Sequence, residues 1–539
     1  MSKSLIIAFS WSDASRLSSI YRPFDCRAST RSCKNPLPPP LGDRYFPSGD
    51  QMKATLQDLT QDAGRISPDV WAVDLDGTLV RTDTLWESVV AAAMRQPLQF
   101  VAALLALRHG RQHFKRQIAE ITVPDPETLP FRAELLRLIR QHRDSGGQLH
   151  LVTAAHQSIA DAVAAHLGVF ASATGSTAQR NLKGITKAAF LAERFPDGFA
   201  YIGDSRADLP VWRRAQGALL VGCTEQLVLA VEAAGIPILA NVPDRRPQAR
   251  DYAKLLRVHQ WEKNILILVP LLLGHALGKP DAWLRVAMAF VAFCMVASST
   301  YIFNDLADLA ADRQHPTKRS RPVAGGDISV PQAMAIAVGL FSLGMSGSFL
   351  ISHAFSLCIS AYVVLTVLYS WALKRIALID AAIIGALSVL RIIIGMCVAP
   401  VPYSDWLVSF SILFFCSLAF AKRHSELIEA TAAGVTRLPG RGYRPGEWPL
   451  TLAFGVSMAI ASLIVMLLYI RLGAMQGGLH SRAGWLIVAP LATLCWIMRL
   501  WLVSHRGELD DDPIVFALRD RVSWGLAAVV AAGVICATS

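Results

Sequence analysis

The chain has 539 residues, a length that excludes a single compact core and predicts two or more domains. Hydrophobic residues make up 53% of it and charged residues only 17%, a balance typical of membrane proteins and not of ordinary water-soluble ones. The formal net charge of +11 does not require a nucleic-acid partner, because loops between membrane spans and phosphate-binding residues account for such an excess, and we expect no nucleic acid.

The first segment, residues 1–65, is rich in Ser, Arg and Pro and has no sustained periodicity, which predicts a disordered extension. Its apolar run Ile6–Phe9 is too short for a secretory signal peptide, and Met52 is an alternative start of the chain. The nine cysteines show no metal-ligand spacing and are interpreted as small core residues.

Residues 66–241 carry the alternating pattern of an α/β domain. Three short apolar runs, separated by helical patterns, predict parallel strands, and a polar motif follows each of them. Because parallel strands end at the same edge of a sheet, these motifs should meet where α/β folds bind ligands. The strands and motifs are Val70–Val73 before DLDGT at residues 74–78, Gln148–Val152 before Thr153, and Phe199–Ile202 before GDSRAD at residues 203–208.

These motifs resemble those of the haloacid dehalogenase superfamily, specifically its phosphatases related to phosphoserine phosphatase. The resemblance implies a Rossmann-like fold with a small helical cap, here about residues 85–130, and an aspartyl-phosphate mechanism that uses Mg2+. The alternative is an inactive relic of the fold. The implied roles are nucleophile for Asp74, general acid and base for Asp76, phosphoryl binding for Thr153, the family's lysine for Lys187 with Lys183 as fallback, and Mg2+ ligation for Asp74, Asp204 and Asp208.

Residues 242–263 are predicted to be a linker and interfacial segment, in which Trp261 and Lys263 are suited to anchor at a membrane surface. Residues 264–539 contain nine apolar stretches, which predict an all-α polytopic membrane domain of about nine spans. Lys and Arg are concentrated in alternate loops, which predicts an inner or plasma membrane protein whose α/β domain and polar loops are cytoplasmic. The stretches are 264–278, 282–303, 330–351, 355–373, 376–398, 406–421, 450–470, 485–502 and 523–538.

The loop Asn304–Gly326 carries Asp305, Asp308 and Asp312, followed by a basic run. If its first half continues the preceding helix, the three acids share one face. Clustered carboxylates repel each other unless cations lie between them, oxygen ligands suit Mg2+, and basic side chains pair with phosphate oxygens. The pattern therefore predicts a metal–diphosphate site beside the lipid; the alternative is an ordinary charged loop.

The spacing of Asn304, Asp305, Asp308 and Asp312 before KRSRP resembles the first aspartate-rich motif of the UbiA superfamily of intramembrane prenyltransferases. The family's second motif usually has two or more acids that hold a prenyl diphosphate, whereas this chain has only Asp380 there. That departure, and KRHSEL at residues 422–427, resemble the decaprenyl-phosphate phosphoribosyltransferase branch, which makes polyprenyl-phosphoryl 5-phosphoribose.

We therefore expect Mg2+-dependent transfer of 5-phosphoribose from phosphoribosyl diphosphate to a polyprenyl phosphate, with the fused phosphatase removing the 5-phosphate. One alternative is a prenyltransferase that uses a prenyl diphosphate and an aromatic or quinone-precursor acceptor. Another is a membrane-anchored phosphatase with a non-catalytic membrane domain. Metal binding is assigned to Asp305, Asp308 and Asp312, and substrate binding to Asn304, Lys318, Arg319, Arg321, Tyr369, Lys374, Asp380, Arg391, Lys422 and Arg423.

Overall fold

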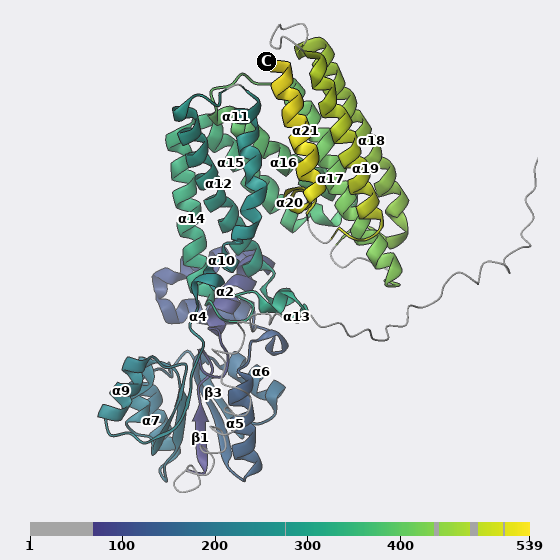
Figure 1. Cartoon of the computed structure of the whole chain (residues 1–539). Coiled ribbons are helices and arrows are strands. Elements are labelled where there is room, and N and C mark those ends of the chain that lie inside the picture. Colours follow the sequence, from purple (N-terminus) through teal and green to yellow (C-terminus); the bar gives the residue numbers. More distant parts are fainter. Residues whose placement is uncertain (1–67, 275, 436–440, 475–482, 510–511, 539) are drawn as a thin grey trace, which may run out of the picture. The chain divides into compact units, whose positions relative to one another are not determined.

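The computed structural model describes residues 68–274, 276–435, 441–474, 483–509 and 512–538. The predicted disordered extension, residues 1–65, lies outside the described residues. Along the described chain a parallel α/β domain comes first, and long helices follow it (Figure 1). The predicted two-part fold class is confirmed.

Six parallel strands form the sheet, in the order β3-β2-β1-β4-β5-β6. The chain adds strands outward from β1, first on one side and then on the other, so the direction of winding changes between β1 and β4. The second strand runs further than predicted, and Thr153 lies within it rather than after its end. The strands are β1 (Val70–Val73), β2 (Gln148–His156), β3 (Ser172–Ser176), β4 (Ala200–Gly203), β5 (Gly217–Val221) and β6 (Ile238–Val242).

Helices cover both faces of the sheet (Figure 1). Trp71 and Val73 pack on one face with residues of two helices, and Ala72 packs on the other with residues of three. Alternate side chains of a strand point to opposite faces, so a strand covered on both sides must be apolar throughout. The helices are α5 (Ala133–Asp144) and α6 (Gln157–Leu167) on the first face, and α7 (Ile185–Arg194), α8 (Leu209–Trp212) and α9 (Glu225–Ala233) on the second.

The region predicted to be a cap is helical. Asp83 starts its first helix by accepting hydrogen bonds from the amides of Leu85 and Trp86, and Pro97 stands at the start of the second, where a missing amide hydrogen costs little. The elements are α2 (Thr84–Arg95), α3 (Pro97–Leu105), η1 (Ala106–His109), α4 (Arg111–Ile121) and η2 (Pro126–Thr128). The helices α2, α3 and α4 pack around Val89, Ala92, Ala103 and Ile118.

Among the described residues, seven helices are long and apolar enough to cross a membrane, or eight if the bent pair α20 (Pro513–Arg519) and α21 (Arg521–Thr538) forms one span. The two helices of that pair meet at 81°. The seven are α12 (Pro280–Ala307), α14 (Val330–Ile351), α15 (His353–Trp371), α16 (Ile379–Val398), α17 (Asp405–Ala432), Pro445–Leu472 with α18 (Trp448–Leu468), and Gly484–His505 with α19 (Val488–His505).

The sequence predicted nine spans. The last predicted stretch, 523–538, counts as a span only if α20 and α21 form one, and the first predicted stretch, 264–278, is not a span. This stretch forms the end of η4 (Val258–Leu268) and the short helix α11 (Val269–Leu273). It is shorter than the ~20 residues that a straight span needs. Pro270, which has no amide hydrogen, lies in the first turn of α11, directly after the end of η4. Shorter elements complete the chain: α10 (Ala249–Leu255), α13 (Leu309–Gln314), η5 (Lys318–Ser320), η6 (Leu373–Arg375), η7 (Pro445–Glu447), η8 (Tyr469–Ala474) and η9 (Ala483–Ile487).

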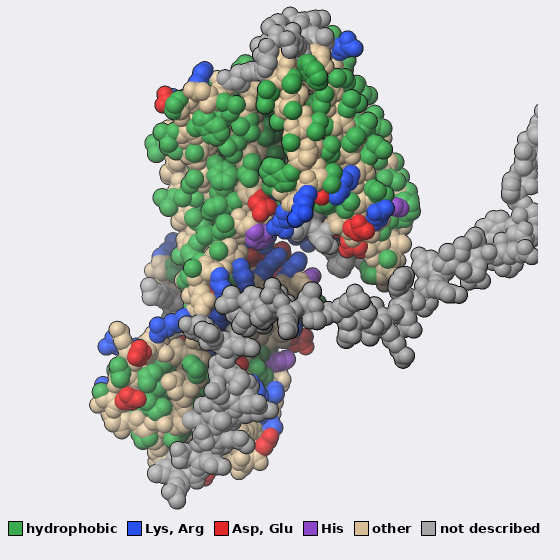
Figure 2. All heavy atoms as spheres, viewed as in Figure 1, with side chains coloured by type: hydrophobic (Ala, Val, Ile, Leu, Met, Phe, Trp, Pro, Cys, Tyr) green, Lys and Arg blue, Asp and Glu red, His purple; other side chains and the backbone are tan. Residues whose placement is uncertain are grey.

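Two large apolar cores lie between the long helices. One contains residues of α12, α15 and α16, the other contains residues of α16, α17, α18 and α19, and α16 contributes to both. On the face seen in Figure 2, hydrophobic side chains also cover the outside of these helices, and most charged side chains gather towards one of their ends. Such an apolar exterior needs lipid around it, so the protein is an integral membrane protein.

Candidate active sites

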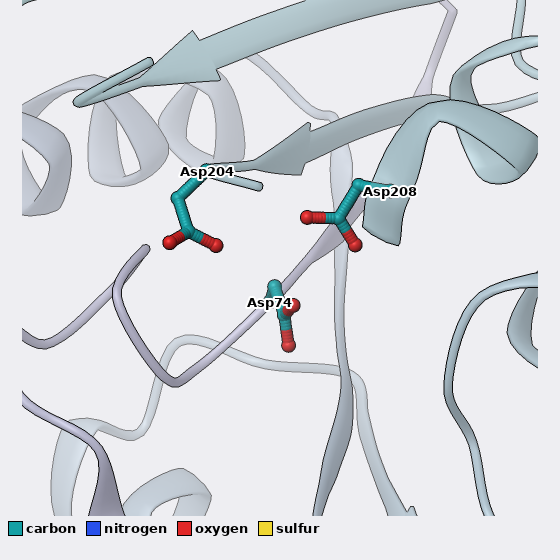
Figure 3. A group of neighbouring side chains, drawn as sticks. All are labelled: Asp74, Asp204 and Asp208. Carbon is teal, nitrogen blue, oxygen red and sulfur yellow. The ribbon is translucent and has the colours of Figure 1, made fainter. Parts of the chain in front are cut away.

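An acidic cluster lies where the winding of the sheet changes direction. Asp74 directly follows β1, Asp204 directly follows β4, and Asp208 ends the 3-10 turn η3 (Arg206–Asp208). One carboxylate oxygen from each lies within 4.8 Å of the others, and Figure 3 shows the three side chains around a common space. In the described parts of the chain this is the only group of three or more Asp, Glu, His or Cys side chains so arranged.

Local geometry holds the cluster in place. Gly77 has a φ of +74°, and a Cβ atom there would lie 2.2 Å from Asp204 Oδ2, so only glycine fits this turn. The Thr78 hydroxyl donates to Asp204 Oδ1 at 3.3 Å. The amide and the hydroxyl of Ser205 both donate to Asp208 Oδ2, at 3.2 and 3.0 Å.

Lys187 is the cation of this site. It is buried, and its Nζ atom lies 2.9 Å from Asp74 Oδ2. It also donates to the hydroxyl of Tyr201 at 2.8 Å, which in turn donates to Asp208 Oδ1 at 3.0 Å. The fallback residue, Lys183, is exposed. Sequence reasoning missed Tyr201, because it lies inside the apolar run that forms β4.

The remaining predicted residues of this domain are Asp76 and Thr153. Burial, reinforced by the nearby Asp83 and Asp74, raises the pKa of Asp76 to about 7, although the Thr84 amide donates to its Oδ1 atom at 2.7 Å. A carboxyl group with that pKa both holds and releases a proton near neutrality. Thr153 is fully buried, and its Oγ1 atom accepts a hydrogen bond from the Ala155 amide at 3.0 Å.

The acidic cluster fits a divalent cation. Burial, together with the charges of Asp74 and Asp208, raises the pKa of Asp204 to about 7. Three carboxylates that oppose each other's ionisation are stabilised by a cation between them, and a set of oxygen donors suits Mg2+.

The aspartate-rich loop of the membrane domain is arranged differently from the prediction. The helix is interrupted at one residue: α12 ends at Ala307 and α13 begins at Leu309, although the Asp308 amide still donates to the Asn304 carbonyl and the Asp312 amide to the Asp308 carbonyl. Asp305 and Asp312 are buried and share the guanidinium of Arg321, whose Nη1 atom lies 2.9 Å from Asp305 Oδ1 and also contacts Asp312 Oδ2. Asp308 is exposed, with Lys374 Nζ 4.0 Å from its Oδ2 atom.

A further cation, Arg257, contacts Asp305 Oδ1. Sequence reasoning missed this role, because Arg257 lies in the connecting segment far from the acidic loop in sequence, and no local pattern marks it. Asn304 is half-buried, one residue before Asp305. Lys318 and Arg319 lie exposed in η5, so the structure brings Arg321, but not these two, between the acids.

The second polar centre surrounds Asp380, which is 0% exposed. Arg423 Nε lies 2.7 Å from Asp380 Oδ2, although the two atoms are not aligned for a straight hydrogen bond, and the Tyr443 hydroxyl donates to Asp380 Oδ1 at 2.8 Å. Arg441 Nη1 lies 3.6 Å from Asp380 Oδ2 and donates to the hydroxyl of Tyr369 at 2.7 Å. Arg441 and Tyr443 come from a loop without periodicity, so no local pattern in the sequence singles them out.

Two predicted binding residues lie outside this centre's contacts. Arg391 donates to Asn264 Oδ1 at 2.9 Å, and its guanidinium lies 5.4 Å from the ring centre of Tyr362. Lys422 is half-buried on α17, beside Arg423 in the chain. Of the predicted binding residues, the structure thus joins Tyr369, Asp380 and Arg423 in one network around Asp380.

Comparison with known proteins agrees with both domains. Residues 267–536 match the UbiA prenyltransferase family, and residues 72–213 match haloacid dehalogenase-like hydrolases. A Sinorhizobium fredii protein, "Uncharacterized protein y4nM", is 44% identical over 464 residues, which cover 86% of this chain and 90% of that protein. The nodulation protein NoeC of Azorhizobium caulinodans is 32% identical over 279 residues, covering 50% of this chain and 88% of NoeC.

A decaprenyl-phosphate phosphoribosyltransferase of Mycolicibacterium smegmatis is 34% identical over 281 residues, covering 50% of this chain and 86% of that enzyme. These matches confirm the predicted fusion and its order along the chain. The chain belongs to the UbiA prenyltransferase family and carries a haloacid dehalogenase-like hydrolase domain ahead of its membrane domain.

Proposed function

We propose that the membrane domain transfers 5-phosphoribose from phosphoribosyl diphosphate to a polyprenyl phosphate, and that the fused phosphatase then removes the 5-phosphate. In the first step the bond between ribose carbon 1 and the diphosphate breaks, and a bond from carbon 1 to the lipid phosphate forms. In the second step water replaces the sugar hydroxyl on phosphorus and releases inorganic phosphate. Both active sites would face the cytoplasm, where phosphorylated donors are made.

The observation that carries the choice of donor is the environment of Asp380. Arg423 and Tyr443 contact this carboxylate, Arg441 lies near it, and Glu426 also pairs with Arg423. Both acids of this centre are therefore already paired with arginine, and neither is free to share in holding a metal-bound prenyl diphosphate. The similarity to a decaprenyl-phosphate phosphoribosyltransferase over 86% of that enzyme supports the same donor and acceptor. Cations beside the site also suit an acceptor that is itself a phosphate.

We assign the first step to the residues of the acidic loop. Asp305, Asp308 and Asp312 would hold Mg2+, which when bound neutralises the diphosphate and makes it a better leaving group. Arg321 lies between two of these acids and is placed to turn to the departing diphosphate, and Asn304 would orient Asp305. Exposed Lys318 and Arg319 would guide the anionic donor to the loop, and Tyr369, Lys374, Arg391, Lys422 and Arg423 would bind the two substrates.

The phosphatase residues fit the second step. Asp74 would attack phosphorus while Asp76 protonates the departing sugar oxygen, and Asp76 would then take a proton from the water that hydrolyses the aspartyl-phosphate. Lys187 and Thr153 would bind the phosphoryl oxygens, and Asp74, Asp204 and Asp208 would hold Mg2+. The raised pKa of Asp76, about 7, suits both directions of proton transfer.

Purified protein in lipid nanodiscs, supplied in turn with labelled phosphoribosyl diphosphate and labelled prenyl diphosphates, tests the donor. We expect label to enter the lipid fraction only from phosphoribosyl diphosphate, and only when a polyprenyl phosphate is present. Transfer from a prenyl diphosphate to an aromatic acceptor, with none from phosphoribosyl diphosphate, would overturn the proposal.

The order of the two steps is tested with one variant in each domain. Asp74→Asn removes the phosphatase nucleophile and should make polyprenyl-phosphoryl 5-phosphoribose accumulate, whereas Asp305→Ala should yield neither this lipid nor its dephosphorylated form. Loss of one member of a catalytic set lowers a rate by orders of magnitude, so mass spectrometry of the lipids separates these outcomes. Finding only the dephosphorylated lipid with purified Asp74→Asn would contradict the series.

A further inference from the structure

The cap of the phosphatase domain presents an apolar surface that its own helices do not cover. Leu98, Val101 and Leu105 of α3 are 86%, 55% and 63% exposed. Their spacing of three and four residues places them on one face of the helix. The buried positions of α3 and η1 are the small residues Ala103 and Ala106, and among the large side chains of α3 only Phe100 packs against the core of the cap.

The exposed apolar residues continue beyond α3. Met94 at the end of α2 and Leu107 in η1 are also exposed. Within α3, Leu104 is exposed as well. Isolated exposed leucines are ordinary, but a run of large apolar side chains along one helix marks a surface that contacts another apolar phase.

The charges around this helix are mostly positive. Exposed Arg95 precedes it, exposed Arg108 follows it, and α4 adds Lys115 and Arg116. Residues 84–121 contain two acids, Glu87 and Glu120. Glu87 is buried against Arg313, and Glu120 pairs with Arg116 at 3.3 Å. An apolar face with basic flanks is the pattern of helices that lie on anionic membrane surfaces.

The packing of the cap places this helix near the membrane. Trp86 and Val90 of α2 share an apolar core with Ile302 and Leu306 of α12 and with residues of α14. Arg313, just beyond the end of α12, forms a buried ion pair with Glu87 on the same cap helix. Helix α3 packs against α2, so it is one helix away from the polar ends of two membrane spans.

We infer that the outer face of α3 is an interfacial anchor, which inserts Leu98, Val101 and Leu105 into the anionic surface of the membrane that the chain's own spans cross. The apolar side chains would lie at the boundary between headgroups and acyl chains, with Arg95 and Arg108 at the level of the lipid phosphates. This inference does not depend on which donor the membrane domain uses. It goes beyond the proposed reaction, because it gives the phosphatase cap a lipid contact of its own.

Photocrosslinking from α3 tests the inference in the full chain. Benzoylphenylalanine at position 98 would be irradiated in nanodiscs that contain labelled phosphatidylglycerol. The matched control carries it at position 185. Ile185 is also strongly exposed, at 73%, but it lies on α7, a helix that packs on the sheet of the same domain and does not belong to the cap. We expect at least fivefold more lipid attached from position 98 than from position 185. Equal labelling, or attachment to a second protein chain in place of lipid, would overturn the inference.

Hydrogen exchange of residues 97–109 provides a second measurement on the unlabelled chain. The amides should exchange more slowly in nanodiscs with phosphatidylglycerol than with phosphatidylcholine alone, and Leu98→Glu with Leu105→Glu should remove the difference while the exchange of β1 and β4 stays unchanged. Identical exchange in both lipids, for a chain that also fails to crosslink, would show that α3 does not touch the membrane.

Discussion

The Lys187 ammonium lies beside the carboxylates of Asp74 and Asp208 and the phenol of Tyr201, where its charge offsets that of Asp74 directly. Lys187→Met keeps the length of the side chain and removes that charge. We expect phosphatase turnover to fall by about 100-fold or more, as when a preorganised electrostatic contact is lost. Hydrolysis of p-nitrophenyl phosphate by the full chain measures this, and lipid transfer should persist.

Lys183→Met is the matched control, since Lys183 lies four residues away in the chain and is exposed. Its turnover should stay within about twofold of wild type, because exposed charges in water contribute little. A Lys183 variant as impaired as the Lys187 variant would show that the family's lysine has been assigned to the wrong residue.

The raised pKa of Asp204 predicts how Mg2+ dependence changes with pH. Its folded pKa of about 7 lies above the ordinary value of 3.8, so the metal-free fold loses stability as the pH rises from 3.8 to about 7, where Asp204 is ionised in the unfolded chain but still protonated in the folded one. Mg2+ binds the ionised form and must displace the proton at lower pH, so its affinity should fall about tenfold per pH unit below pH ~7 if one proton is displaced. The Mg2+ concentration for half-maximal phosphatase activity measures this, and a value that stays constant across that range would contradict the prediction.

At the scale of elements, α16 begins in a strained turn. Leu378 has a φ of +67° and a ψ of −44°, and the Ile379 amide donates to the Ala377 carbonyl at 2.8 Å, which makes a γ-turn of the rare kind. The hydroxyl of Tyr443 accepts from the Leu378 amide at 2.8 Å and donates to Asp380. One side chain thus holds both the strained turn and the buried acid that follows it.

Two substitutions separate the turn from its support. Leu378→Gly relieves the positive φ, which should raise the free energy of unfolding by about 1 kcal/mol. The greater conformational entropy of glycine in the unfolded chain offsets part of this gain. Tyr443→Phe leaves the buried Asp380 oxygen without its donor and should cost about 1–3 kcal/mol. Thermal midpoints from fluorescence-detected size exclusion should move in opposite directions, with Leu378→Ala unchanged as the control. A Tyr443→Phe midpoint equal to that of wild type would contradict this account of the turn.

The elements that the sequence predicted well are those whose signal is local. The acids of DLDGT and GDSRAD each follow an apolar strand directly, so parallel pairing of β1 and β4 was enough to bring Asp74 and Asp204 together. The membrane helices appeared as apolar stretches for the same reason. The stretch 264–278 failed as a span because its length was marginal and Pro270 interrupts it.

The contacts that the sequence did not predict join residues far apart in the chain. Arg257 with Asp305, Tyr443 with Asp380 and Glu87 with Arg313 are paired only by tertiary packing, and a charge in a loop looks the same whether it meets solvent or a partner. The break between α12 and α13 at Asp308 was missed for a related reason, since the acids on both sides of it fit a continuous helix equally well in sequence.

On the scale of the whole molecule, a buried ion pair joins the two domains. Arg313, next to Asp312 in the acidic loop, lies with its Nη2 atom 2.7 Å from Glu87 Oε1 on the cap helix α2. The Thr82 hydroxyl donates to the same carboxylate at 2.6 Å, and the Thr82 carbonyl accepts from the amide of Gly77 at 3.2 Å. The contacts thus run from the acidic loop of the membrane domain to the loop that carries Asp76.

Breaking this pair should affect both reactions. Glu87 and Arg313 are 8% and 7% exposed, and removing one partner of a buried pair costs about 3–5 kcal/mol, because the other charge stays buried without compensation. Glu87→Gln should therefore lower the thermal midpoint and reduce both lipid transfer and phosphatase turnover, by displacing Arg313 on one side and Thr82 on the other. Arg313→Gln should do the same.

The double variant Glu87→Gln with Arg313→Gln leaves no buried charge, so it should be more stable than either single variant, with a coupling energy above about 1 kcal/mol. Glu134→Gln is the matched control, because Glu134 pairs with Arg81 at 3.8 Å while both side chains are 31% exposed, and such surface pairs contribute about 0–1 kcal/mol. Additive effects of Glu87→Gln and Arg313→Gln on stability, with each variant impairing only its own domain's reaction, would show that the two sites work independently. Coupled effects would mean instead that the acidic loop and the phosphatase cap fold and act as one element. The cap would then stay attached to the membrane domain while the phosphatase domain hydrolyses its substrate.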